Sequence, residues 1–198
     1  MKWSVVVVLV GALGACTSDD APAEDVDVAA DTAPAPAADT IAEDPSSGPW
    51  AVSAHMFGSL RLGSTVAEAS SAIDDAIDMS GYGVDFGACD YVRAPSMPDR
   101  TLLMVIDSTD VARVDVASTE VLTTRGVGVG STEQEVIDAY RGRIRVEPHH
   151  YTGPAGHYLV YLAPDDTMFA VVFETDGTRV TTYRAGRQPE VMYVEGCA

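Results

Sequence analysis

The feature of this sequence that most constrains its fold is a short phrase that occurs twice. Residues 63–68 read GSTVAE, and the phrase returns as GSTEQE at residues 130–135. In each copy a threonine, Thr65 or Thr132, stands three residues before a glutamate, and this capping-box pattern marks the start of a helix. We therefore expect one folding unit to be used twice along the chain.

The sequence after each phrase is predicted to fold in the same order. In the first copy we expect an extended segment at 52–62, a helix from residue 66 to the glycine-rich stretch at 80–83, and three strands. In the second copy we expect a helix that carries Val136 and Ile137, followed by four strands. The predicted strands are 88–94, 101–106 and 111–117 in the first copy, and 143–151, 157–162, 168–173 and 179–184 in the second.

Further positions match between the copies at nearly the same spacing, namely Ala94 with Ala163, Ile106 with Phe173, and Arg113 with Arg179. One such unit offers a small sheet and one helix, which is too little to bury a core alone. The predicted fold class is therefore α+β, with two tandem helix-plus-antiparallel-meander repeats forming one compact domain. We place repeat one at about 52–122 and repeat two at about 123–198, within a folded region of 50–198.

Three cysteines occur in the chain, and two of them, Cys89 and Cys197, lie one in each half of the folded region. If Cys16 carries a lipid, the remaining even pair favours a disulfide in an oxidising compartment. Such a bridge would close a long loop and hold the two halves together. The alternative is a pair of free thiols.

Residues 1–16 have the pattern of an export signal. Lys2 gives a short positive end, residues 5–10 are apolar but too few to span a bilayer, and residues 13–16 read LGAC. This pattern resembles the lipobox of bacterial lipoproteins. The resemblance implies removal of a signal peptide at 1–15, acylation of Cys16 with palmitate-type chains, and a lipid anchor in the bacterial cell envelope. An ordinary secretory signal is the alternative.

The stretch after the lipobox is acidic and poor in apolar side chains. Residues 17–49 hold nine acids and no base and consist mostly of Ala, Pro, Asp, Thr and Ser. We interpret residues 16–49 as a lipidated, disordered tether, because this composition cannot bury enough surface to fold. Thr17 occupies the position where an aspartate favours the inner membrane in the lipoprotein family, so the resemblance implies the outer membrane.

The folded region is acidic as well. From residue 50 onward there are 21 acids and 11 bases, all arginine, which gives a formal charge of −10. A surface of this charge repels phosphate backbones, so nucleic acid is disfavoured as a partner.

A tandem helix-plus-meander module in a small exported chain resembles the β-lactamase inhibitor protein family. That resemblance implies a concave sheet that grips a partner protein with aromatic and acidic side chains. The repeats of that family carry internal disulfides, whereas this chain has one cysteine in each half of its folded region. The start of the second helix, with Gly130, Thr132, Glu135 and Val136 at the spacing GxTxxEV, also resembles small lipoproteins of the outer-membrane assembly machinery.

A histidine-rich hairpin is the strongest catalytic candidate in the sequence. Residues 147–151 read EPHHY, and His157 follows a glycine-rich turn. If Tyr151 pairs with His157, then His149 and His157 share a face and could approach a metal together with Glu147. Packing of structural histidines against tyrosines is the alternative, and we assign neither a metal nor another cofactor.

Two further patterns favour binding over catalysis. Arg141, Arg143 and Arg145 alternate, so on a strand they would form a basic stripe for a carboxylate or phosphate, unless nearby acids neutralise a solvated face. Tyrosines, which combine apolar area with a polar tip, are frequent at predicted strand positions, as in binding surfaces. They are Tyr82, Tyr91, Tyr151, Tyr158, Tyr161, Tyr183 and Tyr193.

Together these features favour a non-enzymatic envelope lipoprotein that presents a protein- or ligand-binding domain on a tether. Its expected partners are the membrane, through the lipid, and another envelope protein. A secreted-type enzyme inhibitor is the first alternative, and a metal-dependent hydrolase that uses the His149 and His157 hairpin is the second. We assign no catalytic residue, since the sequence contains neither a nucleophile elbow nor a phosphate loop.

Overall fold

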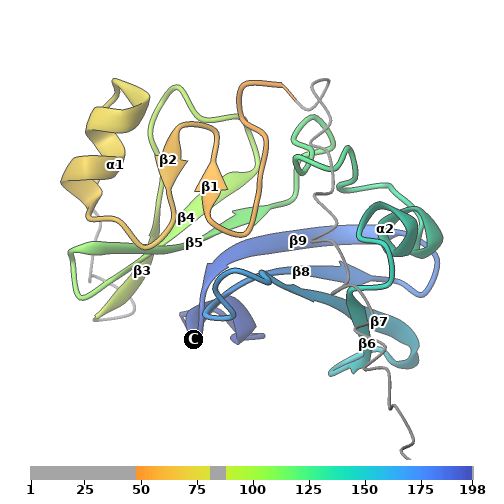
Figure 1. Cartoon of the computed structure of the whole chain (residues 1–198). Helices are drawn as coiled ribbons and strands as arrows, with labels where there is room; N and C mark the ends of the chain where they lie inside the picture. The colour runs from red at the N-terminus through yellow and green to blue at the C-terminus, as the bar shows by residue number, and fades with distance from the viewer. Residues whose placement is uncertain (1–47, 81–87, 198) are drawn as a thin grey trace, which may run out of the picture. The chain divides into compact units, whose positions relative to one another are not determined.

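The computed structural model of the chain describes residues 48–80 and 88–197. The predicted signal peptide, the lipidation site at Cys16 and nearly all of the tether lie outside the described residues. The described part is an α+β fold, mostly β, with two short α-helices and a seven-stranded antiparallel sheet (Figure 1). No helix within these two ranges has the length and apolar character needed to cross a bilayer.

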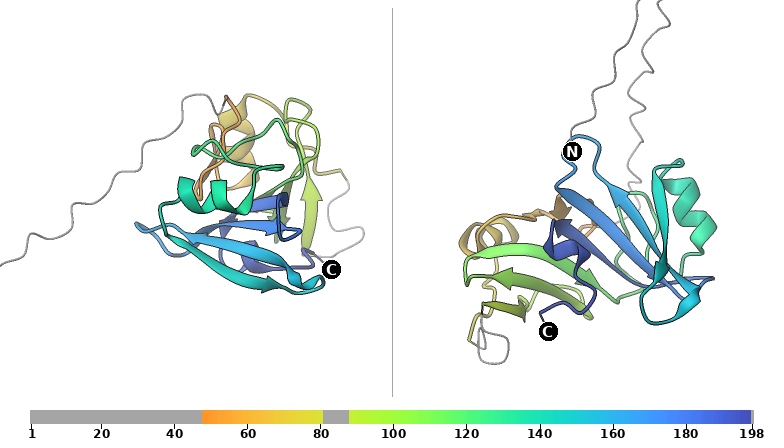
Figure 2. Two further views of the ribbon diagram at one scale, coloured as in Figure 1. Left: turned by 90° about the vertical axis from the view of Figure 1, so that its right-hand side faces the viewer. Right: turned by 90° about the horizontal axis from the view of Figure 1, so that it is seen from below.

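The large sheet contains strands from both halves of the folded region. Its order is β3-β4-β5-β9-β8-β7-β6, so the halves meet in the middle, where β5 pairs with β9 (Figure 2). The strands are β3 (Cys89–Val92), β4 (Thr101–Ile106), β5 (Asp110–Val116), β6 (Ile144–His149), β7 (Gly153–Leu162), β8 (Phe169–Thr175) and β9 (Val180–Arg187). Every strand predicted beyond residue 88 is present, with ends that differ by a few residues.

The junction of β5 and β9 requires a residue without a side chain. Gly186 lies opposite Arg113 in this pair and has a φ of +151°. A Cβ atom at this position would overlap the carbonyl oxygen of Ala112 and the backbone of Arg113. Glycine therefore lets the two halves approach closely enough to form one continuous sheet.

Both predicted capping boxes are confirmed. The helices that begin at the repeated phrases are α1 (Val66–Ile73) and α2 (Glu133–Ala139). The N–H groups of Glu68 and Glu135 each donate to the hydroxyl of the capping threonine, Thr65 or Thr132, at 3.2 Å. Each glutamate side chain in turn accepts the backbone N–H of its threonine, at 2.9 Å in α1 and 2.7 Å in α2. These hydrogen bonds lower the pKa of both carboxyls below the ordinary value.

The first helix ends earlier than predicted. Asp74 has a left-handed φ of 51° and donates its N–H to the carbonyls of Ser70 and Ser71, so α1 stops at Ile73 rather than near residue 80. Ile77, which continues the helical spacing of apolar residues, is buried in the core from the loop that follows. The spacing of apolar residues predicted too long a helix, because a residue in a loop can occupy a core position just as a helical residue can.

Each helix start is bound in the same way to the last strand of its half. Val111 of β5 exchanges backbone hydrogen bonds with Gly63 and Ser64, at 2.7 and 2.9 Å. Val180 of β9 makes the same two bonds, both at 2.9 Å, with the glycine and serine of the second phrase. Both helix starts are therefore joined to the sheet by the same pair of backbone hydrogen bonds.

This pairing corrects one predicted correspondence. Thr65 lies opposite Asp110 in an isolated bridge, and Thr132 lies opposite Arg179. Asp110 is therefore the residue of the first half that is equivalent to Arg179. The prediction aligned Arg113 with Arg179 because both precede a valine, and this placed them three positions out of register.

The segment 52–62 is not the single extended strand that the sequence predicted. It folds into a hairpin of two short strands, β1 (Met56–Phe57) and β2 (Leu60–Arg61). Phe57 and Leu60 are both fully buried. The hairpin lets both side chains face the core, whereas residues three apart on one straight strand point to opposite sides.

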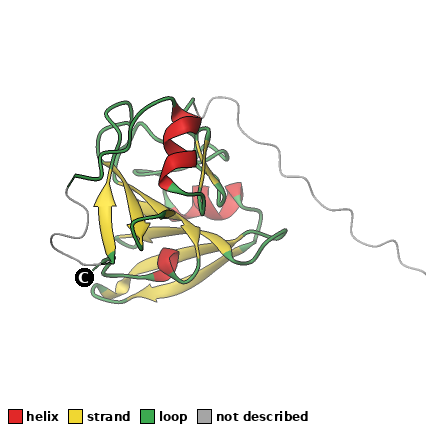
Figure 3. Ribbon diagram, turned by 90° about the vertical axis from the view of Figure 1, so that its left-hand side faces the viewer, coloured by secondary structure: helices red, strands yellow, loops and turns green. Residues whose placement is uncertain are grey.

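Hydrophobic side chains gather on both faces of the sheet, but unequally. The main core lies between the sheet and the layer of α1, α2 and the β1–β2 hairpin (Figure 3), and its largest fully buried side chains include Tyr140, Tyr183, Phe57, Phe173 and Leu103. A second, smaller cluster lies on the opposite face beneath the 3-10 helix η2 (Glu190–Met192). Its buried members are Tyr158, Val160, Ala170, Val172 and Val191.

The predicted disulfide between Cys89 and Cys197 is confirmed, with the two Cα atoms 5.4 Å apart. It joins the first residue of the edge strand β3 to the end of the described chain, at a sequence separation of 108. The bridge therefore fixes the C-terminal segment, residues 188–197, beside the first half of the sheet.

Replacing Thr65 or Thr132 by alanine tests the two capping boxes. Each change removes the acceptor of one helix N–H, so we expect each to lower the free energy of unfolding by about 1 kcal/mol in urea titrations at pH 7. Because the glutamate pKa is lowered in the fold, the wild-type advantage should shrink as the pH falls through the carboxyl range. Thr167→Ala, at an exposed loop position, is the control, and an equal loss there would contradict the assignment.

Replacing Cys89 and Cys197 together by serine tests the bridge. The unfolded chain regains the freedom of the long loop that the bridge closes, so we expect the unfolding free energy to fall by about 2–5 kcal/mol. Wild-type protein in excess dithiothreitol should unfold at the same urea concentration as the double variant. A midpoint unaffected by either treatment would mean that the bridge does not constrain the chain.

Candidate functional site

The two faces of the sheet differ in character. One face carries the main core beneath α1 and α2. On the other face, cross-strand pairs place Leu102 opposite Asp115, Asp115 opposite Arg184, and Arg184 opposite Val172. Directly paired residues share a face. We call the face that carries these four residues the open face. At its centre, where the two halves of the sheet meet, lies a group of charged side chains.

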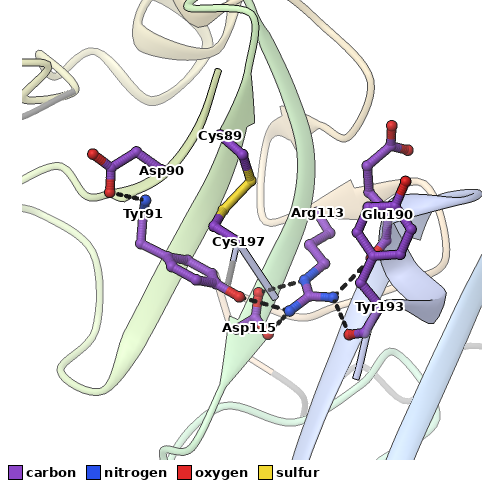
Figure 4. Close-up of a disulfide and its surroundings, with 8 residues drawn as sticks. All are labelled: Cys89, Asp90, Tyr91, Arg113, Asp115, Glu190, Tyr193 and Cys197. Carbon is purple, nitrogen blue, oxygen red and sulfur yellow. Dashed lines mark hydrogen bonds and ion pairs between the residues drawn. A yellow bond between two sulfur atoms is a disulfide. The ribbon is translucent and has the colours of Figure 1, made fainter. Parts of the chain in front are cut away.

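Arg113 occupies the middle of the open face and is only 2% exposed. Its Nε and Nη2 donate to the two carboxylate oxygens of Asp115 at 2.8 and 2.9 Å, and Nη2 also donates to the hydroxyl of Tyr91 at 2.7 Å. Its Nη1 donates to the carbonyls of Glu190 and Tyr193 at 2.7 and 2.8 Å (Figure 4). All five N–H donors of this guanidinium are thus used.

Arg184 extends the charged group onto β9. Its Nε donates to the carbonyl of Val191 at 2.6 Å, its Nη1 pairs with the carboxylate of Glu174, and its guanidinium lies over the ring of Tyr158. Burial raises the pKa of the Asp115 carboxyl, while the nearby guanidinium of Arg113 acts in the opposite direction. Two arginine–carboxylate pairs therefore lie side by side across the β5–β9 junction.

The C-terminal segment closes one side of the open face. Arg113 and Arg184 hold it through its backbone carbonyls, and the disulfide fixes its end. Gly196, with a φ of +67°, lies so close to Tyr91 that a Cβ atom would overlap the tyrosine hydroxyl. The hydroxyl of Tyr151, in the β6–β7 turn, donates to Glu195. The segment is thereby attached to both halves of the sheet.

A cavity of about 560 Å³ opens on the open face, and residues of β3, β4, β5, β8 and β9 and of the C-terminal segment line it. Volumes of this order suit small ligands or a few residues of a bound chain. Its walls combine the charged side chains of Arg113, Asp115 and Arg184 with apolar surface from Leu102 and Val194. Leu102, the second residue of β4, is 40% exposed, which is high for a large apolar side chain on an internal strand.

The wall of this cavity offers charged groups and hydroxyls that can form ion pairs and hydrogen bonds with a ligand. The lining residues include arginines, carboxylates, tyrosines and threonines but no histidine, cysteine or serine. Histidine is the side chain whose ordinary pKa lies closest to neutral pH. Within the described ranges there is also no group of three or more His, Cys, Asp or Glu residues placed to hold a metal.

The histidine hairpin does not bring its candidates together. His157 pairs with Pro148, not with Tyr151 as predicted, because Pro148 and His149 are separated by a register shift. The His157 Nδ1 contacts the Glu133 carboxylate of α2 at 2.8 Å. The His149 ring instead stacks on another side chain at a centroid distance of 4.6 Å.

That partner is Tyr158, and the two rings are nearly parallel, with an interplanar angle of 18°. The His149 Nε2 also lies 3.7 Å from the Glu174 carboxylate. Glu147 pairs with Arg145 at 2.6 Å instead of turning toward either histidine. These contacts correspond to the packing alternative for the hairpin, in which the histidines support neighbouring elements.

The predicted arginine stripe does not form. Strand β6 begins at Ile144, so Arg141 and Arg143 precede it, and Arg141 has a left-handed φ of 45° in the turn after α2. Of the three, Arg145 alone lies on the strand. The turn interrupts the alternation that the prediction assumed.

The tyrosines divide between the core and the open face. Tyr161 and Tyr183 pack in the main core, and burial raises the pKa of Tyr183 well above its ordinary value. Tyr91 and Tyr158 contact the charged group of the open face. Tyr193 belongs to the C-terminal segment. Tyr82 lies outside the described residues.

Sequence reasoning missed the charged centre of the open face, although a signal was present. Arg113 and Asp115 lie at alternate positions inside the strand DVARVDV, and Arg184 lies inside the strand VTTYRAGR. Charged residues at alternate positions of a strand share one face and need partners there. An internal strand with this pattern predicts a buried ion-pair group.

Comparison with models of protein families, with curated proteins and with solved structures found no match to this chain.

Replacing Arg113 by methionine tests its role at the centre of the open face. The change leaves Asp115 without its cation and two carbonyls of the C-terminal segment without donors, so we expect the unfolding free energy to fall by about 3–5 kcal/mol. Arg145→Met, which removes a largely exposed ion pair with Glu147, should change it by less than about 1 kcal/mol. Equal effects of the two changes in urea titrations would contradict a structural centre at Arg113.

Proposed function

We propose that this chain is a non-enzymatic lipoprotein of the bacterial envelope that binds a partner protein through its open face. The cavity beside the C-terminal segment carries this proposal, because its lining joins fixed charges to exposed apolar surface and lacks a residue with ordinary acid–base chemistry near neutral pH. The central charges and Leu102 lie on strands, which hold them rigidly, and Val194 lies on the C-terminal segment, which the disulfide fixes. Rigid, mixed surfaces of this kind are typical of recognition sites.

The proposed location is supported by two parts of the chain. The pattern at residues 13–16 resembles a lipobox, which leads to a lipid on Cys16 and an acidic tether up to residue 49. The disulfide between Cys89 and Cys197 fits an oxidising compartment outside the cytoplasm. A tether would let the domain reach a partner at a distance from the lipid surface, and the absence of aspartate at residue 17 favours the outer membrane.

We also propose that the domain consists of two copies of one unit. The two capped helices and their equivalent hydrogen bonds to Val111 and Val180 support this interpretation. Central pairing of β5 with β9 supports it further, because two copies related by a two-fold axis would pair through equivalent strands. Two small sheets joined in this way leave one long face without an α-helix, and this is the face to which we assign binding.

An enzyme inhibitor remains the second candidate within the same class. The seven-stranded sheet with one face that carries no α-helix is the observation that favours it, in line with the resemblance to the β-lactamase inhibitor family. The two candidates differ in the partner, which is a resident envelope protein in the first case and a secreted enzyme in the second.

A photoreactive amino acid at position 102 tests the binding face. In intact cells that produce the full chain, we expect ultraviolet light to link Leu102→benzoylphenylalanine to one protein of defined mass, identifiable by mass spectrometry. The matched control is Val146, which is 49% exposed but pairs with Leu159 on the core-bearing face. Crosslinks from position 146 but none from position 102 would sink the proposal.

A further inference from the structure

We propose that the cavity on the open face binds a carboxylate carried by an apolar group, as at the C-terminus of a peptide that ends in a large apolar residue, and that Arg93 and Arg100 hold that carboxylate. This inference rests on the proposed function and names the chemistry of the partner. Its starting point is the balance of charge in the cavity wall, where arginines outnumber acids even though the folded region as a whole is strongly acidic.

Two of the arginines in the wall are already neutralised by the protein. Arg113 forms a bidentate pair with Asp115, and Arg184 pairs with Glu174. The remaining acid of the wall, Glu195, accepts the hydroxyl of Tyr151. The cations that no acid of the cavity wall pairs with are therefore Arg93 and Arg100, at the end of the cavity where β3 leads into β4.

Arg93 has hydrogen-bonding capacity that the fold does not use. Its Nη2 donates to the Met97 carbonyl at 2.9 Å and lies 3.5 Å from Asp99, whose side chain is 95% exposed and therefore well solvated. Its Nε is buried and has no hydrogen-bond partner among the described residues. A buried N–H without an acceptor is unfavourable. The Arg93 side chain as a whole is 40% exposed, so a rotation of its guanidinium would bring this N–H to a carboxylate bound in the cavity.

Arg100 provides the second cation. It is exposed, with a left-handed φ of 59°, in the loop just before β4, and its guanidinium forms no ion pair within the described part of the chain. Its backbone is fixed, because its carbonyl accepts the N–H of Ala117 at 2.9 Å. Arg100 has an unpaired guanidinium on a fixed backbone and lines the same cavity as Arg93. Two guanidinium groups in one cavity wall offer planar sets of donors that match a carboxylate.

The rest of the wall determines what the carboxylate is attached to. Leu102 and Val194 present apolar surface, and Tyr91 lines the same cavity. An apolar side chain next to the carboxylate would cover this surface and exclude water. The domain charge repels anions at long range, so the two local cations and the apolar contact together must supply the affinity.

Matched peptides test the proposal. The probe is acetyl-Ala-Ala-Phe with a free C-terminal carboxylate, titrated by calorimetry into the full chain with its disulfide intact, and the comparison is the same peptide as its C-terminal amide. We expect the acid to bind at least about tenfold more tightly than the amide, since a hydrogen bond to a charged group contributes an effect of this size. Equal affinity of acid and amide, or heat from neither, overturns the proposal.

Variants locate the effect. Arg93→Gln with Arg100→Gln should abolish the preference for the acid, while Arg61→Gln, which removes the same charge at an exposed position outside the cavity, should leave it unchanged. Arg100→Gln alone should reduce the preference severalfold. This single variant keeps the result interpretable if replacing Arg93 loosens the loop at 94–100. An unchanged preference in all three variants overturns the assignment to these arginines.

The outcome separates this inference from the proposed function. A partner captured through position 102, together with equal binding of the acid and the amide, means that the open face binds but does not select a carboxylate. Binding of the acid peptide without any capture at position 102 in cells means that the cavity selects a carboxylate while the proposed partner protein is wrong.

Discussion

The rest of the structure depends on the hydrogen bonds and the ion pair that the buried guanidinium of Arg113 forms. A buried guanidinium needs a carboxylate and an acceptor for each N–H, and here the acceptors come from β5, from Tyr91 on β3 and from the carbonyls of Glu190 and Tyr193. Lysine has three donors around one point, so it could not bind this spread-out set. One side chain thereby fixes the edge of the first half of the sheet, the junction of the two halves and the C-terminal segment relative to one another.

This arrangement explains why the two faces of the sheet have different uses. The helices and the β1–β2 hairpin bury one face in a conventional apolar core. The other face is covered at its centre by residues 188–197, which are held by two arginines and closed by the disulfide, and the cavity lies where this cover ends. Rigid charges beside unfilled apolar surface give a surface suited to recognition, and the binding function that we propose follows from that combination.

Much of the fold could be predicted from the sequence, and the reasons for the rest are physical. The capping boxes depend on local hydrogen bonds, so Thr65 and Thr132 marked both helix starts, and β4 matched its predicted ends because its apolar run is bounded by turns. The end of α1 at Asp74 and the hairpin at Phe57 were missed, since packing decides them. The charged group of the open face was not predicted. His149 and Arg145 belong to short patterns that are visible locally in the sequence, whereas Arg113 binds residues that lie about 80 positions further along the chain.

Hydrogen exchange, followed by mass spectrometry on the full chain alone and in complex with its captured partner, tests the central claim most directly. If the open face binds, protection on complex formation should concentrate in β3, β4 and the C-terminal segment, with little change in α1 and α2. Protection confined to the helices and to the loop at 118–131, with the C-terminal segment exchanging as before, would contradict the account.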